Sequence, residues 1–284
     1  MDVPQSSSHS RDHATSSLGK LIEAQKSDPI IQIYNRDALD KALRSYIGTN
    51  KYCNVGFWED GCEDLGSATR NLIARVIKGL GTDCERILDV GSGLGAGTAQ
   101  IKAAFPRAAV TGINISALQV AECRREFPEC EFFPMDATNL EFADGSFDAV
   151  ASTEAAFHFN TREKFFREAL RVLKKGGRLS VADIICCQGE ASKVLCRWPV
   201  EEANFLSGPD DYRAMLERVG FADVRIEDIT NRTWTAWCRN IERSLPRDLA
   251  EGVMTEEFFE VCRQTLPEIR AGAKHYVQVS AIRP

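Results

Sequence analysis

The sequence predicts an α/β protein built on a mostly parallel sheet with helices on both faces. Two observations carry this prediction. Short apolar segments alternate with amphipathic ones from residue 86 to residue 186, which is the pattern of successive strand–helix–strand units. The first apolar segment also runs directly into a glycine-rich turn, at residues 91–97. With 284 residues, 44% of them hydrophobic, the chain is long enough to bury a sizeable core.

The elements follow from local signals. Pro106 stops the helix after the glycine-rich turn, Ser116 can cap the next helix, and Gly176 and Gly177 mark the end of a third. Strands are expected at 86–90, 109–114, 131–135, 147–152 and 178–186, and helices at 97–105, 117–127 and 161–173. A helix at 210–219 and strands at 221–229 and 275–282 complete the pattern.

The flanking regions suggest three parts. Residues 1–18 are polar and Ser-rich, so we expect a disordered tail. Residues 19–80 are expected to form an N-terminal helical lid, with helices at about 21–47, interrupted by Pro29, and at 65–80. Residues 81–284 then form the main domain, with cap inserts at about 188–208 and 230–272.

Composition excludes several classes of protein. The net charge is −6, whereas binding to nucleic-acid backbones favours a basic face. No apolar run approaches the ~18 residues that would indicate a membrane span, and the N-terminus has no signal-peptide core. We therefore expect a cytoplasmic protein. None of its ten cysteines forms a C-x-x-C pair, so we expect no metal site and mostly buried, apolar cysteines.

The glycine-rich turn is the first candidate site. Glycines after a strand allow a close backbone approach to a ligand at a helix N-terminus, and such a turn can bind NAD or another nucleoside. Asp89, just before the glycines, suits a cationic amino-acid group. Asp136 follows the third strand, where its carboxylate can accept a hydrogen bond from an adenine amino group, and the Ala137 backbone can contact the ring edge.

Together these motifs resemble the class I S-adenosylmethionine-dependent methyltransferases. The resemblance depends on DVGSGLG (89–95), GINIS (112–116) with Gln119, MDATNLEFADGSFD (135–148) and EALRVLKKGGRL (168–179). It is closest to the sterol, tocopherol and natural-product branch, in which NVGFW (54–58) resembles the loop that covers the cofactor. It implies a seven-stranded Rossmann-like sheet with an antiparallel last strand, and S-adenosylmethionine as the cofactor.

The resemblance also implies a set of cofactor-binding residues. They are Tyr52, Trp58, Asp89, Gly91, Ser92, Gly93, Asn114, Ile115, Gln119, Asp136, Ala137 and Thr153. Asn114 departs from the acid that many methyltransferases use to hold the ribose hydroxyls, although an amide can still accept and donate a hydrogen bond. The same departure argues against an NAD-dependent oxidoreductase, which needs an acid at about this position.

The acceptor side of the site is expected after the fourth strand. His158 is the candidate general base, because an imidazole can take a proton from a hydroxyl or amine at neutral pH. It could instead line the site without base chemistry, and Glu154 is a second catalytic candidate. Six aromatic residues of the inserts either belong to the core or line an apolar pocket: Trp198, Phe205, Trp234, Trp237, Phe258 and Phe259.

The sequence therefore predicts methyl transfer to a small, largely apolar acceptor, as in specialised metabolism. It leaves open O, N and alkene C as the methylated atom, the last with a cyclisation step. One alternative is a protein of this fold that binds the cofactor without turning it over, as a binding or cyclising module. The less favoured alternative is the NAD-dependent oxidoreductase, and a homo-oligomer is left open.

Overall fold

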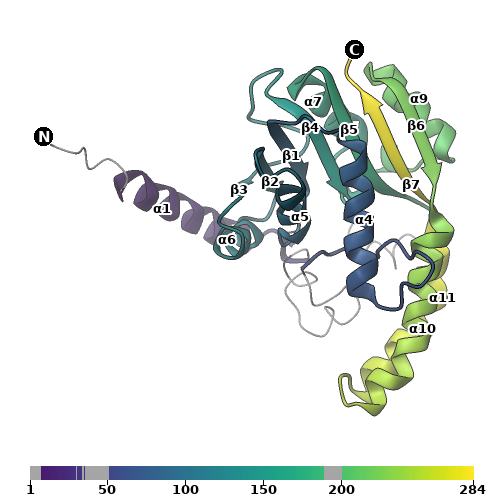
Figure 1. The fold of residues 1–284 in the computed structure, drawn as a ribbon. Helices are drawn as coiled ribbons and strands as arrows, with labels where there is room; N and C mark the ends of the chain where they lie inside the picture. Colours follow the sequence, from purple (N-terminus) through teal and green to yellow (C-terminus); the bar gives the residue numbers. More distant parts are fainter. Residues whose placement is uncertain (1–7, 30, 34, 36–50, 189–199) are drawn as a thin grey trace, which may run out of the picture.

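In the computed structural model, which describes residues 8–29, 31–33, 35, 51–188 and 200–284, one sheet organises the protein (Figure 1). Its strand order is β3-β2-β1-β4-β5-β7-β6. The strands are β1 (Arg86–Val90), β2 (Ala109–Asn114), β3 (Glu131–Pro134), β4 (Phe147–Thr153), β5 (Leu173–Cys186), β6 (Ala222–Asp228) and β7 (Ala273–Ile282). β1 to β5 pair in parallel, and β7 lies antiparallel between β5 and β6. The predicted fold class is confirmed.

Helices cover both faces of the sheet. The helices of the described residues are α1 (Ser8–Gln25), α4 (Leu65–Gly79), α5 (Ala96–Ala104), α6 (Ala117–Glu126), α7 (Arg162–Val172), α9 (Pro209–Val219), α10 (Trp234–Ala250) and α11 (Glu256–Gly272), and of these α4 to α9 flank the sheet. Short 3₁₀ turns are η1 (Ala156–His158), η2 (Glu202–Asn204) and η3 (Thr230–Arg232). α4 and α5 share one apolar cluster with the sheet, α7 and α9 share another, and α6 packs on β2 and β3.

The helix expected in the N-terminal lid packs directly on the sheet. Its buried residues, among them Leu72, Ile73 and Val76, recur at helical spacing and form a single apolar face. Ser180 in β5 donates a hydrogen bond to the Val76 carbonyl at 2.8 Å. A Cβ on Gly79 would lie 2.3 Å from the Ser180 hydroxyl, so the helix and the strand need glycine there. α4 is therefore part of the helical layer of the sheet.

The strand order brings three turns to one edge of the sheet. β1 pairs with β2 on one side and β4 on the other, with Asp89 opposite Gly112 and Ala151. Because parallel strands end at the same edge, the segments that follow these three strands lie close together. The order of the strands switches sides at β1, since β2 and β3 lie on one side of it and β4 and β5 on the other. Open α/β sheets bind ligands at such a switch point.

Two predicted boundaries are wrong. Gly176 and Gly177 do not end a helix: α7 ends at Val172, and both glycines lie inside β5, which begins at Leu173 opposite Phe147. A Cβ on Gly177 would lie 2.7 Å from the Lys174 carbonyl oxygen, so glycine is required by this close approach. Residues 8–18, expected in a disordered tail, belong to helix α1. Of the predicted helices at 21–47, residues 31–33 and 35 are helical, and residues 30, 34 and 36–47 lie outside the described residues.

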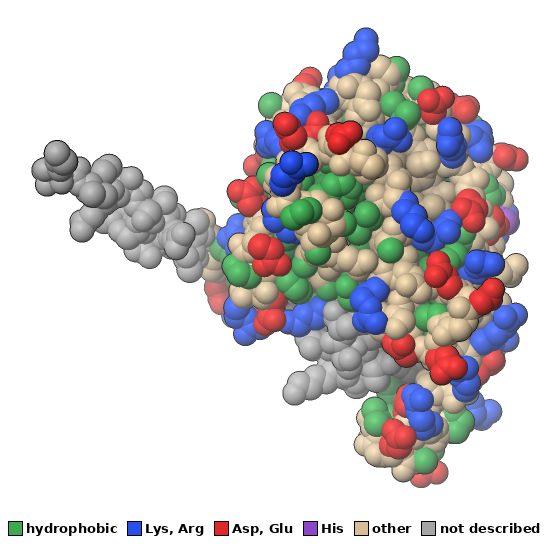
Figure 2. All heavy atoms as spheres, viewed as in Figure 1, with side chains coloured by type: hydrophobic (Ala, Val, Ile, Leu, Met, Phe, Trp, Pro, Cys, Tyr) green, Lys and Arg blue, Asp and Glu red, His purple; other side chains and the backbone are tan. Residues whose placement is uncertain are grey.

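α10 and α11 form a hairpin that projects beyond the sheet (Figures 1 and 2). The buried residues at its base, including Trp234, Trp237 and Ile241, continue the apolar cluster under α4. Acidic and basic side chains are interspersed over the face seen in Figure 2. Within the described part of the chain, no helix is both long enough and apolar enough to cross a membrane.

Candidate functional site

The glycine-rich turn after β1 is fixed by the neighbouring strand. The Gly91 and Ser92 amides both donate to the Ile113 carbonyl of β2, at 3.0 and 2.9 Å. Gly91, Gly93 and Gly95 have φ of 80°, 53° and 89°, a region that favours glycine. A Cβ on Gly91 would lie 2.4 Å from the Ala155 Cβ, so the turn also packs tightly on the segment after β4.

Two buried polar side chains at this turn, those of Asp89 and Ser92, have few hydrogen-bond partners among the described residues. Asp89 is buried and accepts a hydrogen bond from the Thr98 hydroxyl at 2.6 Å. Burial raises the pKa of Asp89 to about 6, and the Thr98 hydrogen bond opposes that rise. The Ser92 hydroxyl is buried and has no hydrogen-bond partner among the described residues. A buried polar atom without a partner is costly, so this turn favours a polar ligand.

Asn114, at the end of β2, supports the turn. Its amide nitrogen donates to the Gly93 carbonyl at 3.1 Å and to Gln119 Oε1 at 2.8 Å. Its Oδ1 accepts from the Ser116 amide at 3.0 Å. The remaining lone pair of Oδ1 can accept one further hydrogen bond, as from a ribose hydroxyl. Gln119 is buried beside it, and the Ile115 side chain is exposed.

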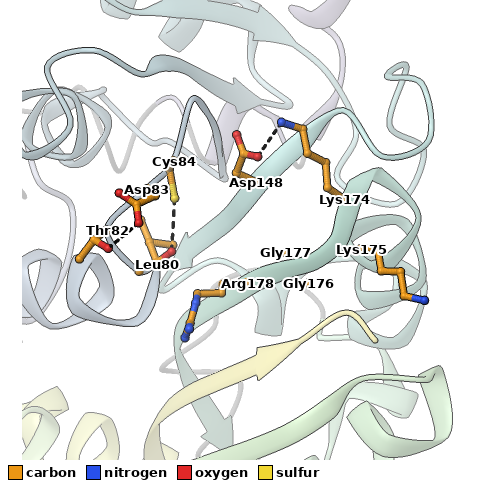
Figure 3. Close-up of a pocket in the computed structure, with 11 residues that line it drawn as sticks. Leu80, Thr82, Asp83, Cys84, Asp148, Lys174, Lys175, Gly176, Gly177 and Arg178 are labelled. Atoms are coloured by element: carbon orange, nitrogen blue, oxygen red, sulfur yellow. Dashed lines mark hydrogen bonds and ion pairs between the residues drawn. The ribbon is translucent and has the colours of Figure 1, made fainter.

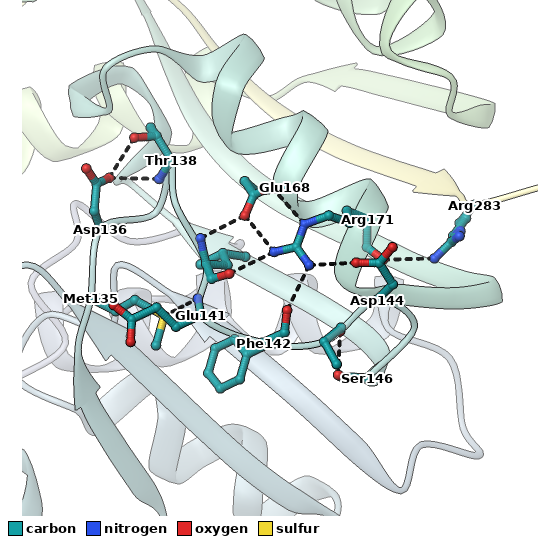
Figure 4. A network of polar contacts seen from close by, with 12 residues as sticks. Met135, Asp136, Thr138, Glu141, Phe142, Asp144, Ser146, Glu168, Arg171 and Arg283 are labelled. Atoms are coloured by element: carbon teal, nitrogen blue, oxygen red, sulfur yellow. Dashed lines mark hydrogen bonds and ion pairs between the residues drawn. The ribbon is translucent and has the colours of Figure 1, made fainter.

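The loop after β3 is held by an arginine on α7 (Figure 4). Arg171 donates to the Leu140 and Phe142 carbonyls, both at 2.7 Å, and its partner Glu168 accepts from the Leu140 amide at 2.8 Å. At the start of this loop, Asp136 Oδ1 accepts from the Thr138 amide and hydroxyl, both at 2.8 Å. Glu168 and Arg171 thus fix the loop that carries Asp136 and Ala137.

Glu154 follows Thr153, the last residue of β4, and has a φ of 50°. Its Oε1 accepts from the Val55 amide at 2.8 Å and from the Tyr276 hydroxyl at 2.7 Å. Burial raises the pKa of Glu154 to about 7, against the lowering effect of these two donors. Glu154 therefore joins β4, β7 and the aromatic segment 52–58.

His158 ends the 3₁₀ turn η1, directly after the segment that packs on Gly91. Its ring lies 3.6 Å from the Phe157 ring, measured between centroids. Burial, together with the nearby Arg162 guanidinium, holds the pKa of His158 well below its usual value. The imidazole is consequently neutral at physiological pH, and its burial beside Arg162 makes it a weak base.

The aromatic segment 52–58 is anchored at several points. The Phe57 amide donates to the Ala68 carbonyl of α4 at 2.8 Å, and the Trp58 amide donates to the Arg232 carbonyl at 2.7 Å. The Trp58 indole donates to the Val55 carbonyl at 3.0 Å, and both Tyr52 and Trp58 pack against the cluster under α4. Cys53 is the residue of this segment that meets the glycine turn, since a Cβ on Gly93 would lie 3.6 Å from Cys53 Cβ.

A buried polar network behind η1 was not predicted. Arg162 is 1% exposed and donates to Asp183 Oδ2 at 2.7 Å, and Asp183 is 0% exposed. Tyr212 donates to the same oxygen at 3.0 Å. Asn204 completes the network through Arg162. The single signal for it in the sequence is Asp183, an acid within an apolar strand.

The sequence of the chain is similar to those of known proteins. Residues 88–181 match a family described as a methyltransferase domain. An O-methyltransferase of Penicillium expansum is 34% identical over 215 residues, covering 70% of this chain and 74% of that protein. The chain belongs to the S-adenosylmethionine-dependent methyltransferases.

Two further similarities support the placement. The 27-O-demethylrifamycin SV methyltransferase of Amycolatopsis mediterranei is 30% identical over 218 residues, covering 73% of this methyltransferase and 79% of its relative. The crystal structure of the [4+2]-cyclase SpnF superposes with a TM-score of 0.69, at 24% identity, over 90% of this chain and 95% of that one.

The cofactor of the methyltransferase is S-adenosylmethionine. The residues present fit this group: the glycine turn gives close backbone access, and the buried Ser92 hydroxyl is available to it within the described residues. Asp89, the Oδ1 atom of Asn114, and the Asp136–Ala137 loop offer further polar contacts. Bound there, the cofactor supplies a methyl group on a sulfonium sulfur.

A separate hollow of about 410 Å³ lies at the opposite edge of the sheet (Figure 3). It is lined by the loop after α4 and by residues near the start of β4 and β5, among them Asp148 and Lys174, which form an ion pair at 2.6 Å. The glycine turn follows the carboxyl end of β1, so this hollow is distinct from the cofactor site.

The remaining predicted residues differ in how deeply they are buried. Trp234 and Trp237 are buried in the core of the methyltransferase with ring centroids 5.0 Å apart, while Phe205, Phe258 and Phe259 are partly buried against it. Trp198 lies outside the described residues. Cys123, Cys130, Cys186, Cys238 and Cys262 are buried, and their sulfur atoms are thiols rather than parts of disulfides. Among the described residues, no group of His, Cys, Asp and Glu could hold a metal ion.

Proposed function

We propose that this methyltransferase methylates a hydroxyl oxygen of a small, largely apolar acceptor, and that His158 is the general base. One observation carries the proposal: a neutral imidazole stands directly after the segment that packs on the cofactor turn. The relatives named as O-methyltransferases, from Penicillium expansum and other fungi, favour oxygen as the methylated atom.

The low pKa of His158 determines at which stage of the reaction the hydroxyl proton of the acceptor is transferred. A weak base does not ionise an alcohol in advance, so the hydroxyl stays protonated while it is positioned. As the oxygen bonds to the methyl carbon, the oxygen becomes acidic and its proton passes to the imidazole. The bound cofactor would supply the methyl group, and its sulfur would keep the electron pair of the C–S bond as a neutral thioether. Alignment and exclusion of water account for the rest of the rate.

The surroundings of His158 favour an apolar acceptor. Phe157 and Phe159 flank it in the sequence, and Phe157 shares the apolar cluster that includes Trp237 and the partly buried Phe205. Of these residues, Phe159 and Phe205 keep some exposed apolar surface that an acceptor can bury, at about 25 cal/mol per Å². We expect hydroxylated polyketides or phenols to bind better than charged amines.

The test compares hydroxylated macrolides and phenols with their deoxy analogues, measuring S-adenosylhomocysteine release and product mass together. We expect turnover with the hydroxyl compounds alone, and His158→Ala to lower kcat by about 10²–10⁴-fold. His275→Ala is the matched control, because His275 pairs with Asp228 on the far strands. Turnover of the deoxy analogues with S-adenosylhomocysteine release would favour alkene methylation instead. A ring-closed product formed without S-adenosylhomocysteine would favour a cyclising role.

A further inference from the structure

Asn204 brackets the residue that we propose as the base. It lies in η2, just before α9, and is 1% exposed. Its amide nitrogen donates to the Phe159 carbonyl at 2.7 Å and to the Phe157 carbonyl at 3.2 Å. These two carbonyls stand on either side of His158, so one side chain binds the backbone both before and after it.

The amide of Asn204 can take only one orientation. Its Oδ1 accepts from the Arg162 amide at 2.8 Å, and the Arg162 guanidinium donates to the Asn204 carbonyl. A reversed amide would place an oxygen against two carbonyls and an NH₂ group against an N–H. Because every polar atom of the side chain is matched, neither aspartate nor a flipped asparagine satisfies the same partners.

The partners of Asn204 are themselves immobilised. Asp183 accepts from the Phe157 amide at 3.1 Å through one oxygen, and from Arg162 and Tyr212 through the other. Arg162 also donates to the Ile184 carbonyl at 2.5 Å. Asp183 of β5 therefore binds the Phe157 N–H, and Asn204 of η2 binds the Phe157 carbonyl. A buried ion pair with all its partners satisfied is a rigid support.

We propose that Asn204 is a positioning residue for His158. It links residues 200–208, the end of the expected cap insert, to the turn that carries the imidazole. The position of this insert therefore determines the position of the His158 side chain. The proposal builds on the base role of His158, and it adds a residue that contacts neither cofactor nor acceptor. A displacement of about 1 Å at a catalytic group can cost ~10²-fold in rate.

A double-mutant cycle tests this positioning role. We expect Asn204→Asp, which has nearly the same shape but places a carboxylate oxygen against the Phe157 and Phe159 carbonyls, to lower kcat by about 10–10²-fold with a hydroxyl acceptor. S-adenosylhomocysteine affinity should be unchanged. In a His158→Ala background, Asn204→Asp should cost less than about threefold, because an absent base cannot be misplaced. Exposed Asn231→Asp is the matched control and should leave kcat unchanged in both backgrounds.

The outcomes separate the two proposals. If His158→Ala alone leaves kcat unchanged, the proposed base role fails. If His158→Ala lowers kcat but Asn204→Asp lowers it by the same factor in both backgrounds, Asn204 does not act through His158. A parallel loss of cofactor affinity would likewise make Asn204 a structural residue. If the Asn204→Asp protein does not fold, Asn204→Ser, which keeps one donor, replaces it in the double-mutant cycle with His158→Ala. The outcomes are interpreted in the same way.

Discussion

The Tyr276 hydroxyl donates a 2.7 Å hydrogen bond to Glu154, joining residues 122 positions apart in the chain. The Val55 amide binds the same carboxylate oxygen. One partly buried acid thus connects the antiparallel strand β7, the end of β4 and the aromatic segment 52–58. Its protonation state consequently affects three parts of the fold at once.

Glu154→Gln should make the cofactor-free protein more stable at alkaline pH. Burial raises the pKa of Glu154 from 4.5 to about 7, so its contribution to stability is fully present below pH 4.5 and is lost as the pH rises through 7. Glutamine keeps the accepting oxygen and lacks the charge. Denaturant unfolding from pH 4 to 8.5 should show the variant gaining up to about 2–3 kcal/mol relative to the wild type.

The control for this experiment is Tyr276→Phe. The tyrosine hydrogen bond lowers the pKa of Glu154, so its removal should move the loss of stability to higher pH. Parallel pH–stability curves for the wild type and Glu154→Gln would contradict a titrating Glu154.

Gly91→Ala should weaken cofactor binding. The added Cβ would lie 2.4 Å from the Ala155 Cβ, and a φ of 80° is strained for alanine. We expect S-adenosylhomocysteine affinity to fall by about 10–100-fold in titration calorimetry, consistent with ~1–3 kcal/mol of strain. Gly19→Ala, at a position with nothing within 4 Å, is the control. Unchanged affinity in a folded Gly91→Ala protein would refute the tight approach.

The amides of Phe57 and Trp58 should exchange slowly even without cofactor. Both donate to backbone carbonyls of other elements, Ala68 and Arg232. A lid that closes on binding would instead exchange quickly until the cofactor arrives. Hydrogen-exchange mass spectrometry of peptides covering 51–58, with and without S-adenosylhomocysteine, distinguishes the two. Rapid exchange at both amides in the cofactor-free protein would restore the lid interpretation for this segment.

Gln25→Ala should lower cofactor affinity from a distance. Gln25, at the end of α1, donates to the Ile115 carbonyl and accepts from the Ala117 amide, both at 2.9 Å. These groups flank the turn after β2, beside Asn114. The loss of these two hydrogen bonds, one exposed and one partly buried, each contributing ~0.5–1.5 kcal/mol at most, should raise the cofactor Kd by about 2- to 10-fold. Lys20→Ala, an exposed change on the same helix, should leave the Kd as it is.

Local signals were sufficient for most of the sheet, but not for the start of β5. β1 and β2 begin and end where alternation and glycine predict, and Ser116 caps α6 through a 3.2 Å hydrogen bond to the Gln119 amide. These features depend on neighbours within a few residues, so sequence periodicity reports them. The Gly176–Gly177 prediction was wrong because a glycine pair has the same local signature at a helix end and inside a strand. The pairing of Leu173 with Phe147 decides between them.

The candidate site was predictable in part. The glycine turn and the loop of Asp136 follow single strands, and a motif marks each one. Asp183 and Arg162 lie 21 residues apart, and Asn204 a further 21 beyond Asp183. No spacing rule links such positions, because the fold alone brings them together. The part played by Tyr276 was hidden in the same way, since it depends on β7 pairing with β5.

The position of β7 also bears on the order in which the protein is made. β5 and β6 both pair with β7, which is translated last of the three, after the α10–α11 hairpin. Until residues 273–282 leave the ribosome, the edge of β5 is uncovered and β6 has no strand beside it. A nascent chain must therefore carry an open, aggregation-prone sheet edge through the synthesis of the whole hairpin. Selection against misfolding should act most strongly on this late strand.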